Sequence, residues 1–242
     1  MSGHSKWSSI KHKKGINDAK RANVFTKLGN MISVAAREGG GGDMDINFKL
    51  KMAVDKARSE NMPKENIERA IKRGTGELKD GNQIEEVVYE AYGPGQVAML
   101  IKTTTDNKNR TVGEVRHILT KNNGKFVPSG SVSYMFETVG EVVVNGENIN
   151  GVEEFELVAI EAGAEDIEKK EDVFLVKTKV SDLQKVKENI EKEGYKIESA
   201  ELIYSANQKV SLSGDDEEKY MKLVEALEEN DDVVDIYDNL SY

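Results

Sequence analysis

The first chemistry that the sequence offers is neutralisation of phosphate by a dense set of basic side chains near the N-terminus. Among the first 37 residues, eight are Lys or Arg and only Asp18 is acidic. Lysines on an arm reach phosphates as point charges on flexible stems, and each contact releases bound counterions. We therefore predict a polyanion contact at the basic side chains Lys6, Lys11, Lys13, Lys14, Lys20, Arg21 and Lys27.

Two other side-chain types in the same arm suit nucleic acid. Trp7 is the only tryptophan of the chain, and it could stack on a base, an interaction worth about 1–3 kcal/mol. Its alternative role is to anchor the arm on the helices that follow. His12 could donate to a phosphate or a ribose, or it could be an ordinary surface residue.

A second candidate contact lies near the middle of the chain. The segment from Asp106 to Thr111 contains Asp, Asn and Thr, which are typical of helix starts. The N–H groups at the start of a helix can bind an anion, and Arg110 and Arg116 add positive charge. We predict a second nucleic-acid contact at Asn107, Arg110 and Arg116, although helix capping alone explains part of the pattern.

The net charge of −10 hides a gradient along the chain. Residues 1–80 contain 17 basic and 10 acidic side chains, a balance of +7. Residues 81–138 contain six of each, and residues 139–242 contain 11 basic and 28 acidic side chains, a balance of −17. This asymmetry favours a polyanionic partner for the N-terminal third, with solvated Lys-rich helices as the alternative.

Several classes of function find no support in the residues. The absence of cysteine excludes disulfides, thiolate zinc sites and cysteine nucleophiles, and three histidines are too few and too scattered for a catalytic zinc site. The acidic pairs Glu217–Glu218 and Asp231–Asp232 are typical of a solvated face rather than a metal cluster. We expect no enzymatic activity, no cofactor and no metal. With no long apolar run and no signal-peptide pattern, we expect a cytoplasmic protein. Of the oligomeric states, we favour the monomer.

Apolar spacing places these residues on helices and strands. A period near 3.6 predicts helices from Asp18 to about Gly39, over 46–57, and from Pro63 to Gly74. Strands are then predicted over 87–92 and 97–101, across the Gly93-Pro94-Gly95 turn. A helix over 109–121 and a strand over 131–136 follow.

The next segment predicts a β-α-β-β-α-β unit, which is the ferredoxin-like arrangement. Its strands are expected over 141–144, 165–168, 173–177 and 197–203, and its helices over 152–162 and 183–192. A strand over 209–212, a helix over 216–228 and a strand over 233–237 complete the chain.

The predicted fold class is therefore α+β, with a helical domain and two α+β domains. Residues 1–80 form the basic arm and a three-helix bundle. Residues 81–137 plus 205–242 form one discontinuous α+β domain, into which the ferredoxin-like residues 138–204 are inserted. The alternative is two tandem units that divide near residue 138.

Several motifs closely resemble the YebC family over nearly the whole chain. They begin with Met1–Trp7, Ile10–Lys14, Asp18–Arg21 and Phe25–Leu28, and continue with Asn61–Pro63, Asn66–Ile71, Tyr89–Gly95, Thr105–Thr111, Glu114–His117, Gly130–Phe136 and Ala162–Asp166. The departures are small. Ser2 replaces the commoner Ala, Ala22-Asn23 stands where Gly-Lys is frequent, and Lys108 stands where Arg is frequent.

The resemblance implies three domains and no enzymatic activity. Some members of the family are described as DNA-binding transcriptional regulators, while others are similar to translation factors, including a mitochondrial activator of cytochrome c oxidase subunit I. Our first hypothesis is a regulator that contacts ribosomal RNA on the ribosome. The alternatives are a regulator that binds promoter DNA, and a protein-interaction module without nucleic acid.

Overall fold

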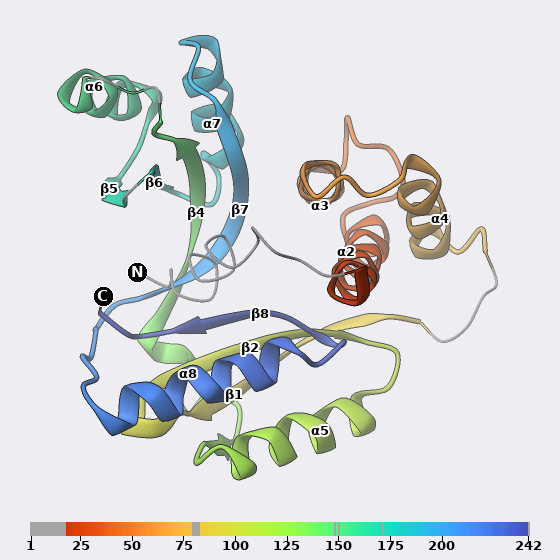
Figure 1. Ribbon diagram of the computed structural model, residues 1–242. Coiled ribbons are helices and arrows are strands. Elements are labelled where there is room, and N and C mark those ends of the chain that lie inside the picture. Colours follow the sequence, from red (N-terminus) through yellow and green to blue (C-terminus); the bar gives the residue numbers. More distant parts are fainter. Residues whose placement is uncertain (1–17, 79–82, 148, 150, 171, 242) are drawn as a thin grey trace. The chain divides into compact units, whose positions relative to one another are not determined.

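The computed structural model describes residues 18–78, 83–147, 149, 151–170 and 172–241, and for residues 18–21 the backbone alone. The chain divides into two compact units. One contains the described residues up to Glu137 together with those from Ser205 onwards, and the other is Thr138–Tyr204. The first unit holds three N-terminal helices and a four-stranded sheet, and the second holds another four-stranded sheet (Figure 1).

The N-terminal helices form a small bundle with its own core. They are α2 (Asp18–Glu38), α3 (Phe48–Ser59) and α4 (Lys64–Thr75). Ile32, Leu50 and Val54 are fully buried at its centre, because apolar residues recur on one face of each helix. Asn47 caps α3: its side chain accepts from Leu50 N at 3.0 Å and donates to the carbonyl of Ala35 at 2.9 Å, which ties α3 to α2.

The end of α4 differs from the prediction that Gly74 terminates it. The helix continues to Thr75, and Gly76 takes the left-handed conformation, φ 80°, that ends it. Gly74 is needed instead where α4 approaches α2. A Cβ at this position would lie 2.3 Å from the carbonyl oxygen of Ser33, so only glycine lets the two backbones come this close.

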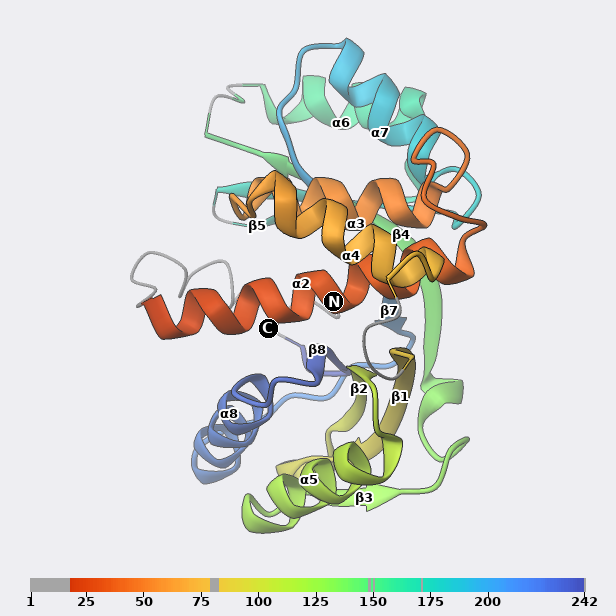
Figure 2. The ribbon, with the colours of Figure 1, turned by 90° about the vertical axis from the view of Figure 1, so that its right-hand side faces the viewer.

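The sheet of the first unit has the strand order β3-β1-β2-β8. Its strands are β1 (Glu85–Tyr92), β2 (Ala98–Thr105), β3 (Lys125–Val127) and β8 (Val233–Asp238), with the short turn helix η2 (Pro94–Gln96) between β1 and β2. Two helices, α5 (Lys108–Lys121) and α8 (Asp215–Glu228), lie on one face of this sheet (Figures 1 and 2). The core between these layers contains the fully buried Met99, Ile101, Leu119 and Leu223.

Two predicted strands of this unit are wrong, and one strand was missed. Within the predicted strand over 131–136, Ser133–Met135 form the short helix η3, and only Phe136 belongs to a strand, which it begins. Residues 209–212 form no strand. Their pairing is limited to one isolated bridge between Val210 and Leu240. The missed strand, β3, has three residues, which is too short for an alternating pattern to show.

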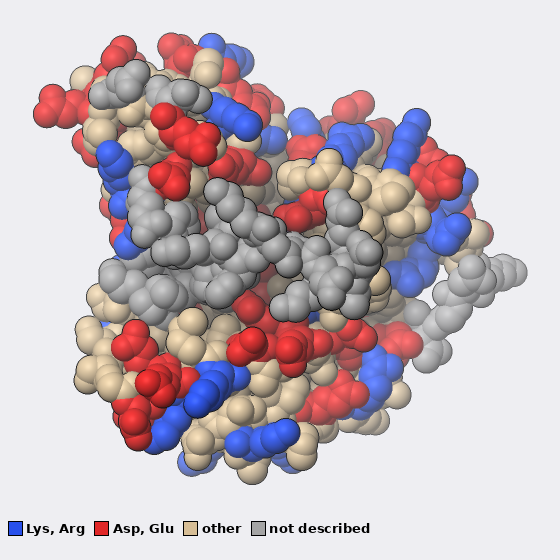
Figure 3. All heavy atoms as spheres, viewed as in Figure 1, with Lys and Arg blue, Asp and Glu red and all other residues tan. Residues whose placement is uncertain are grey.

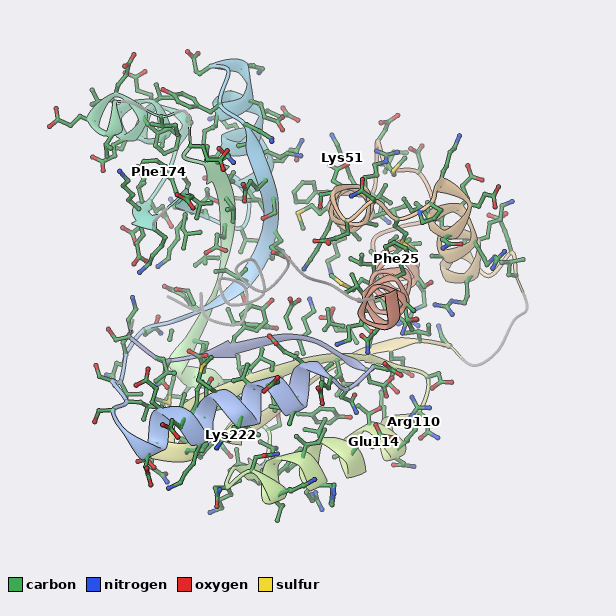
Figure 4. All side chains as sticks on the ribbon, viewed as in Figure 1. Phe25, Lys51, Arg110, Glu114, Phe174 and Lys222 are labelled. Carbon is green, nitrogen blue, oxygen red and sulfur yellow. The ribbon has the colours of Figure 1, made fainter. Side chains whose placement is uncertain are left out.

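The second unit follows the predicted β-α-β-β-α-β succession, with the sheet order β5-β6-β4-β7. Its elements are β4 (Phe136–Asn145), α6 (Val152–Ala162), β5 (Asp166–Lys170), β6 (Val173–Thr178), α7 (Leu183–Lys192) and β7 (Ile197–Ala206). Phe155 and Phe174 pack with ring centroids 4.6 Å apart, and Phe174 is labelled in Figure 4. The α+β class is confirmed.

The close approach of α4 to α2 can be tested with two glycine substitutions. Gly74→Ala should lower the free energy of unfolding by about 1–3 kcal/mol, because the added Cβ overlaps Ser33. Gly113→Ala, on α5 with nothing within 4 Å of the new Cβ, should raise it by up to about 1 kcal/mol. Urea denaturation of both variants measures the difference, and equal effects would contradict the packing described.

Candidate nucleic-acid interface

Most of the predicted arm contacts lie outside the described residues. These are Lys6, Trp7, Lys11, His12, Lys13 and Lys14. Lys20 and Arg21 belong to the first turns of α2, but only their backbone is described. Their roles in binding nucleic acid stay predictions.

Lys27 contacts the protein itself. Its Nζ donates to the carbonyl oxygen of Glu228 at 2.6 Å, at the C-terminal end of α8. Burial lowers the pKa of Lys27, and the negative charges of Glu228 and Asp231 act in the opposite direction. A cation at this end of a helix satisfies a carbonyl and complements the helix dipole. Lys27 therefore joins α2 to α8, and its predicted phosphate contact stays untested.

The start of α5 is organised by Asn107 and Arg110. The side chain of Asn107 accepts from Arg110 N at 3.1 Å and caps the helix. The Arg110 guanidinium lies 3.0 Å from a carboxylate oxygen of Asp106 and 2.8 Å from one of Asp232, with Glu114 at 3.9 Å (Figure 4). The hydrogen bond with Asp232 raises the pKa of Arg110. Three carboxylates thus already balance the charge of Arg110.

Asp232 contacts two side chains at this end of the helix, and the predicted nucleic-acid contact of Asn107 and Arg110 stays a prediction. Its carboxylate is buried and accepts from Thr111 Oγ1 at 2.6 Å as well as from Arg110. The hydroxyl of Thr105 lies 2.7 Å from that of Thr111 and extends the same network. An external phosphate would have to compete with a carboxylate that is already held by hydrogen bonds.

Arg116 has different surroundings from Arg110. It is exposed, and its guanidinium carbon lies 4.9 Å from the centre of the Phe126 ring. Within the described residues no carboxylate lies within 4 Å of Arg116, Lys121 or Lys125. These three residues belong to the longest stretch of the chain without Asp or Glu, the 22 residues from Val115 to Phe136.

The bundle provides further unpaired cations that the sequence reasoning missed. Several of its basic residues pair within the protein, among them Lys56 with Asp235 at 3.6 Å and Lys64 with Glu68 at 3.7 Å. Four others have neither a carboxylate within 4 Å nor a hydrogen-bond acceptor for the side chain in the described parts of the chain: Lys49, Lys51, Arg69 and Lys72. Figure 3 shows Lys and Arg spread over this helical part, and Figure 4 labels Lys51. The three-residue spacing of Arg69 and Lys72 was the available signal.

A buried carboxylate fixes the loop that follows β3. Glu90 is 5% exposed, and its oxygens accept from the backbone N–H groups of Gly130 at 2.7 Å, Val132 at 2.6 Å and Ser133 at 3.1 Å. Burial raises the pKa of Glu90, but these N–H donors outweigh that effect, and the pKa lies below its ordinary value of 4.5. Hydrogen bonding to the charged form therefore holds the loop and the carboxylate together.

Among the described residues, no three His, Asp or Glu side chains gather as a metal site would require. No helix in the same residues is both long and apolar enough to cross a membrane.

Comparison with known proteins covers nearly the whole chain. Residues 5–77 match the family model of the TACO1/YebC N-terminal domain, and residues 84–240 match that of the TACO1/YebC second and third domain. A protein of Thermoanaerobacter pseudethanolicus named "probable transcriptional regulatory protein" is 50% identical over 99% of this chain and 97% of its own. One of Persephonella marina with the same name is 52% identical, over 99% and 95%.

A solved structure is also similar. The crystal structure of a conserved hypothetical protein from Aquifex aeolicus has a TM-score of 0.88 with this chain and is 45% identical to it. The match covers 96% of this chain and 95% of the other. The similarity of fold therefore extends over both units.

The role of the Glu90 carboxylate in holding the loop after β3 can be tested by Glu90→Gln. The substitution replaces one carboxylate oxygen, which accepts hydrogen bonds, by an NH2 group, which donates them to no acceptor here. The free energy of unfolding at neutral pH should therefore fall by about 1–3 kcal/mol. Because the folded pKa of Glu90 is lowered, the carboxylate stabilises the fold above about pH 4.5, and this contribution is lost as the pH falls through the folded pKa. The deficit of the variant should therefore shrink in acid.

The matched control for this test is Glu137→Gln. Glu137 is exposed, and the change should alter stability by less than about 0.5 kcal/mol. Urea denaturation of both variants across pH provides the measurement. A deficit of Glu90→Gln that stays constant from neutral to strongly acidic pH would contradict the role of the charge.

Proposed function

Because the chain belongs to the TACO1/YebC family, we propose that it is a non-enzymatic, nucleic-acid-binding regulator of gene expression. In this proposal it acts on the ribosome and contacts RNA through its basic N-terminal region. The observation that carries the proposal is the charge gradient, from +7 over residues 1–80 to −17 over residues 139–242. A polyanion is attracted to the first of these regions and repelled by the second.

The pairing of cations in the described residues supports this assignment. On the bundle, Lys49, Lys51, Arg69 and Lys72 have no carboxylate partner among those residues, so their charges are available to phosphates. A protein that neutralises several phosphates gains affinity from the release of counterions without reading sequence. The bundle thus adds to the positive charge of the arm.

Two features favour RNA over duplex DNA. The sequence contains no helix-turn-helix pattern, zinc finger or other element known to read the major groove. The arm contains one tryptophan that could stack on an unpaired base, and recognition of unpaired bases by aromatic side chains is typical of RNA-binding proteins. A regulator that binds promoter DNA is the second candidate, and the name "probable transcriptional regulatory protein" given to the relatives favours it.

The proposal predicts that the protein sediments with ribosomal particles and that the arm is required. Lys11→Glu, Lys13→Glu and Lys14→Glu combined should move the protein to the top of a sucrose gradient, because repulsion replaces three phosphate contacts. The matched control is Lys185→Glu, Lys192→Glu and Lys196→Glu, three exposed lysines of the second unit. It changes the net charge equally and should leave sedimentation unchanged.

The same gradient separates the alternatives. Ribonuclease treatment should release the wild-type protein from heavy fractions if RNA holds it there. Wild-type protein at the top of the gradient, with recovery of specific promoter fragments, would favour the DNA-binding regulator. Sedimentation with particles that survives the arm substitutions would favour a protein-interaction module and would contradict the phosphate contacts.

A further inference from the structure

Tyr134 is an aromatic side chain that lies on the surface. Its residue surface is 73% exposed, and it is the only aromatic residue among the exposed large hydrophobic residues of the described chain. The others in that set are aliphatic: Ile46, Leu157, Ile160, Val180 and Met221. At this exposure most of the surface of the residue is open to a planar ligand.

The backbone around Tyr134 is held rigidly. It lies in η3 between Val132 and Phe136, which are 0% and 8% exposed and anchor the turn on both sides. The N–H of Met135 donates to the carbonyl of Val132 at 2.9 Å, and the N–H groups of Val132 and Ser133 are bound by the buried Glu90. Because the turn is already ordered, a ligand that binds Tyr134 loses little conformational entropy.

The chain that leads to this turn is positively charged, and the exposed Glu137 is the first acidic residue after it. Tyr134 lies within the acid-free stretch from Val115 to Phe136. The stretch also contributes the exposed Arg116, Lys121 and Lys125, which have no carboxylate partner among the described residues. The nearby carboxylate of Glu90 is buried and engaged by three N–H donors, so it offers little repulsion to an anion.

The topology brings Arg116, Lys125 and the loop that leads to Tyr134 to the same edge strand, with Arg116 on the face of Phe126 and Lys125 on the other face. β3 is the edge strand, and Lys125 lies at its start opposite Tyr92 of β1. The next residue is Phe126, and the guanidinium carbon of Arg116 lies 4.9 Å from the centre of its ring. The loop that leads to Tyr134 begins directly after β3 and is bound to Glu90, the partner of Val127 in the register.

We propose that this edge is a second contact for single-stranded RNA, at which Tyr134 stacks on an unpaired base while Arg116, Lys121 and Lys125 contact the flanking phosphates. The proposal deepens the proposed function and rests on it. An exposed ring beside unpaired cations is the combination that single-strand binding uses, since every base has a face on which an aromatic ring can stack. Duplex DNA keeps its bases stacked internally and gives Tyr134 no partner.

The test uses the full chain and a short oligouridine RNA that carries one 2-aminopurine. Binding is measured by fluorescence anisotropy, and stacking by quenching of the 2-aminopurine emission. Tyr134→Ala should weaken binding about tenfold and remove the part of the quenching that Tyr134 causes. Tyr134→Phe keeps the ring and should bind within about twofold of wild type. Leu157→Ala, an exposed apolar residue of the second unit, is the control and should change neither signal.

A second set of variants tests the phosphate contacts. Lys121→Glu with Lys125→Glu should reduce the slope of log affinity against log salt by about 1.4, which corresponds to two contacts on a single strand. Cross-linking with 5-iodouridine RNA should attach the RNA to Tyr134 in the wild-type protein. This measurement does not depend on any variant folding correctly.

The outcomes separate this inference from the proposed function. If the RNA binds in a salt-dependent manner that requires the arm lysines, but Tyr134→Ala binds as wild type and cross-links map elsewhere, the stacking site is overturned and the proposed function stands. If Tyr134→Phe weakens RNA binding as much as Tyr134→Ala does, the base does not stack on the ring face, and the stacking site is again overturned. If the wild-type protein binds no RNA, both fail.

Discussion

The buried carboxylate of Glu90 is the interaction on which the segment between β3 and β4 depends. Three backbone N–H groups would have no acceptor in the protein without it, and the carboxylate would be a buried charge without them. The hydrogen bonds between the carboxylate and these N–H groups keep residues 130–133 in a turn. In this turn Val132 and Phe136 are buried while Tyr134 is exposed. The same turn leads directly into β4, the strand with which the chain enters the second unit.

The charge gradient along the chain carries the functional argument, and the pairing of individual cations supports it. Lys27, Lys56 and Arg110 contact carbonyl or carboxylate oxygens of the protein, and these contacts stabilise the first unit. Cations without a carboxylate partner in the described chain include those on α3 and α4 and along the stretch from Val115 to Phe136, and they also occur in other parts, for example at Lys185, Lys192 and Lys196. The acidic side chains concentrate in residues 139–242. A chain of net charge −10 can therefore still attract a polyanion locally.

The sequence predicted those elements whose signals are local. The bounds of α6 and α7 agree with the prediction to the residue, because each helix has a clear apolar face and flanking turns. The prediction failed where a distant residue decides the structure. Val132, Tyr134 and Phe136 alternate as in a strand, but Glu90, which precedes Val132 by 42 residues, turns the segment into η3. Likewise, no spacing rule could pair Arg110 with Asp232 or Lys27 with Glu228, so their roles inside the protein were missed.

The central claim is that unpaired cations of this chain contact the phosphates of RNA. The most direct test is the affinity of the purified full chain for a single-stranded RNA, measured by anisotropy over a series of salt concentrations. The claim predicts a linear fall of log affinity with log salt, with a slope of about −0.7 for each phosphate contacted, and weaker binding to duplex DNA of the same sequence. An affinity that does not change with salt, or no binding to RNA at all, would contradict it.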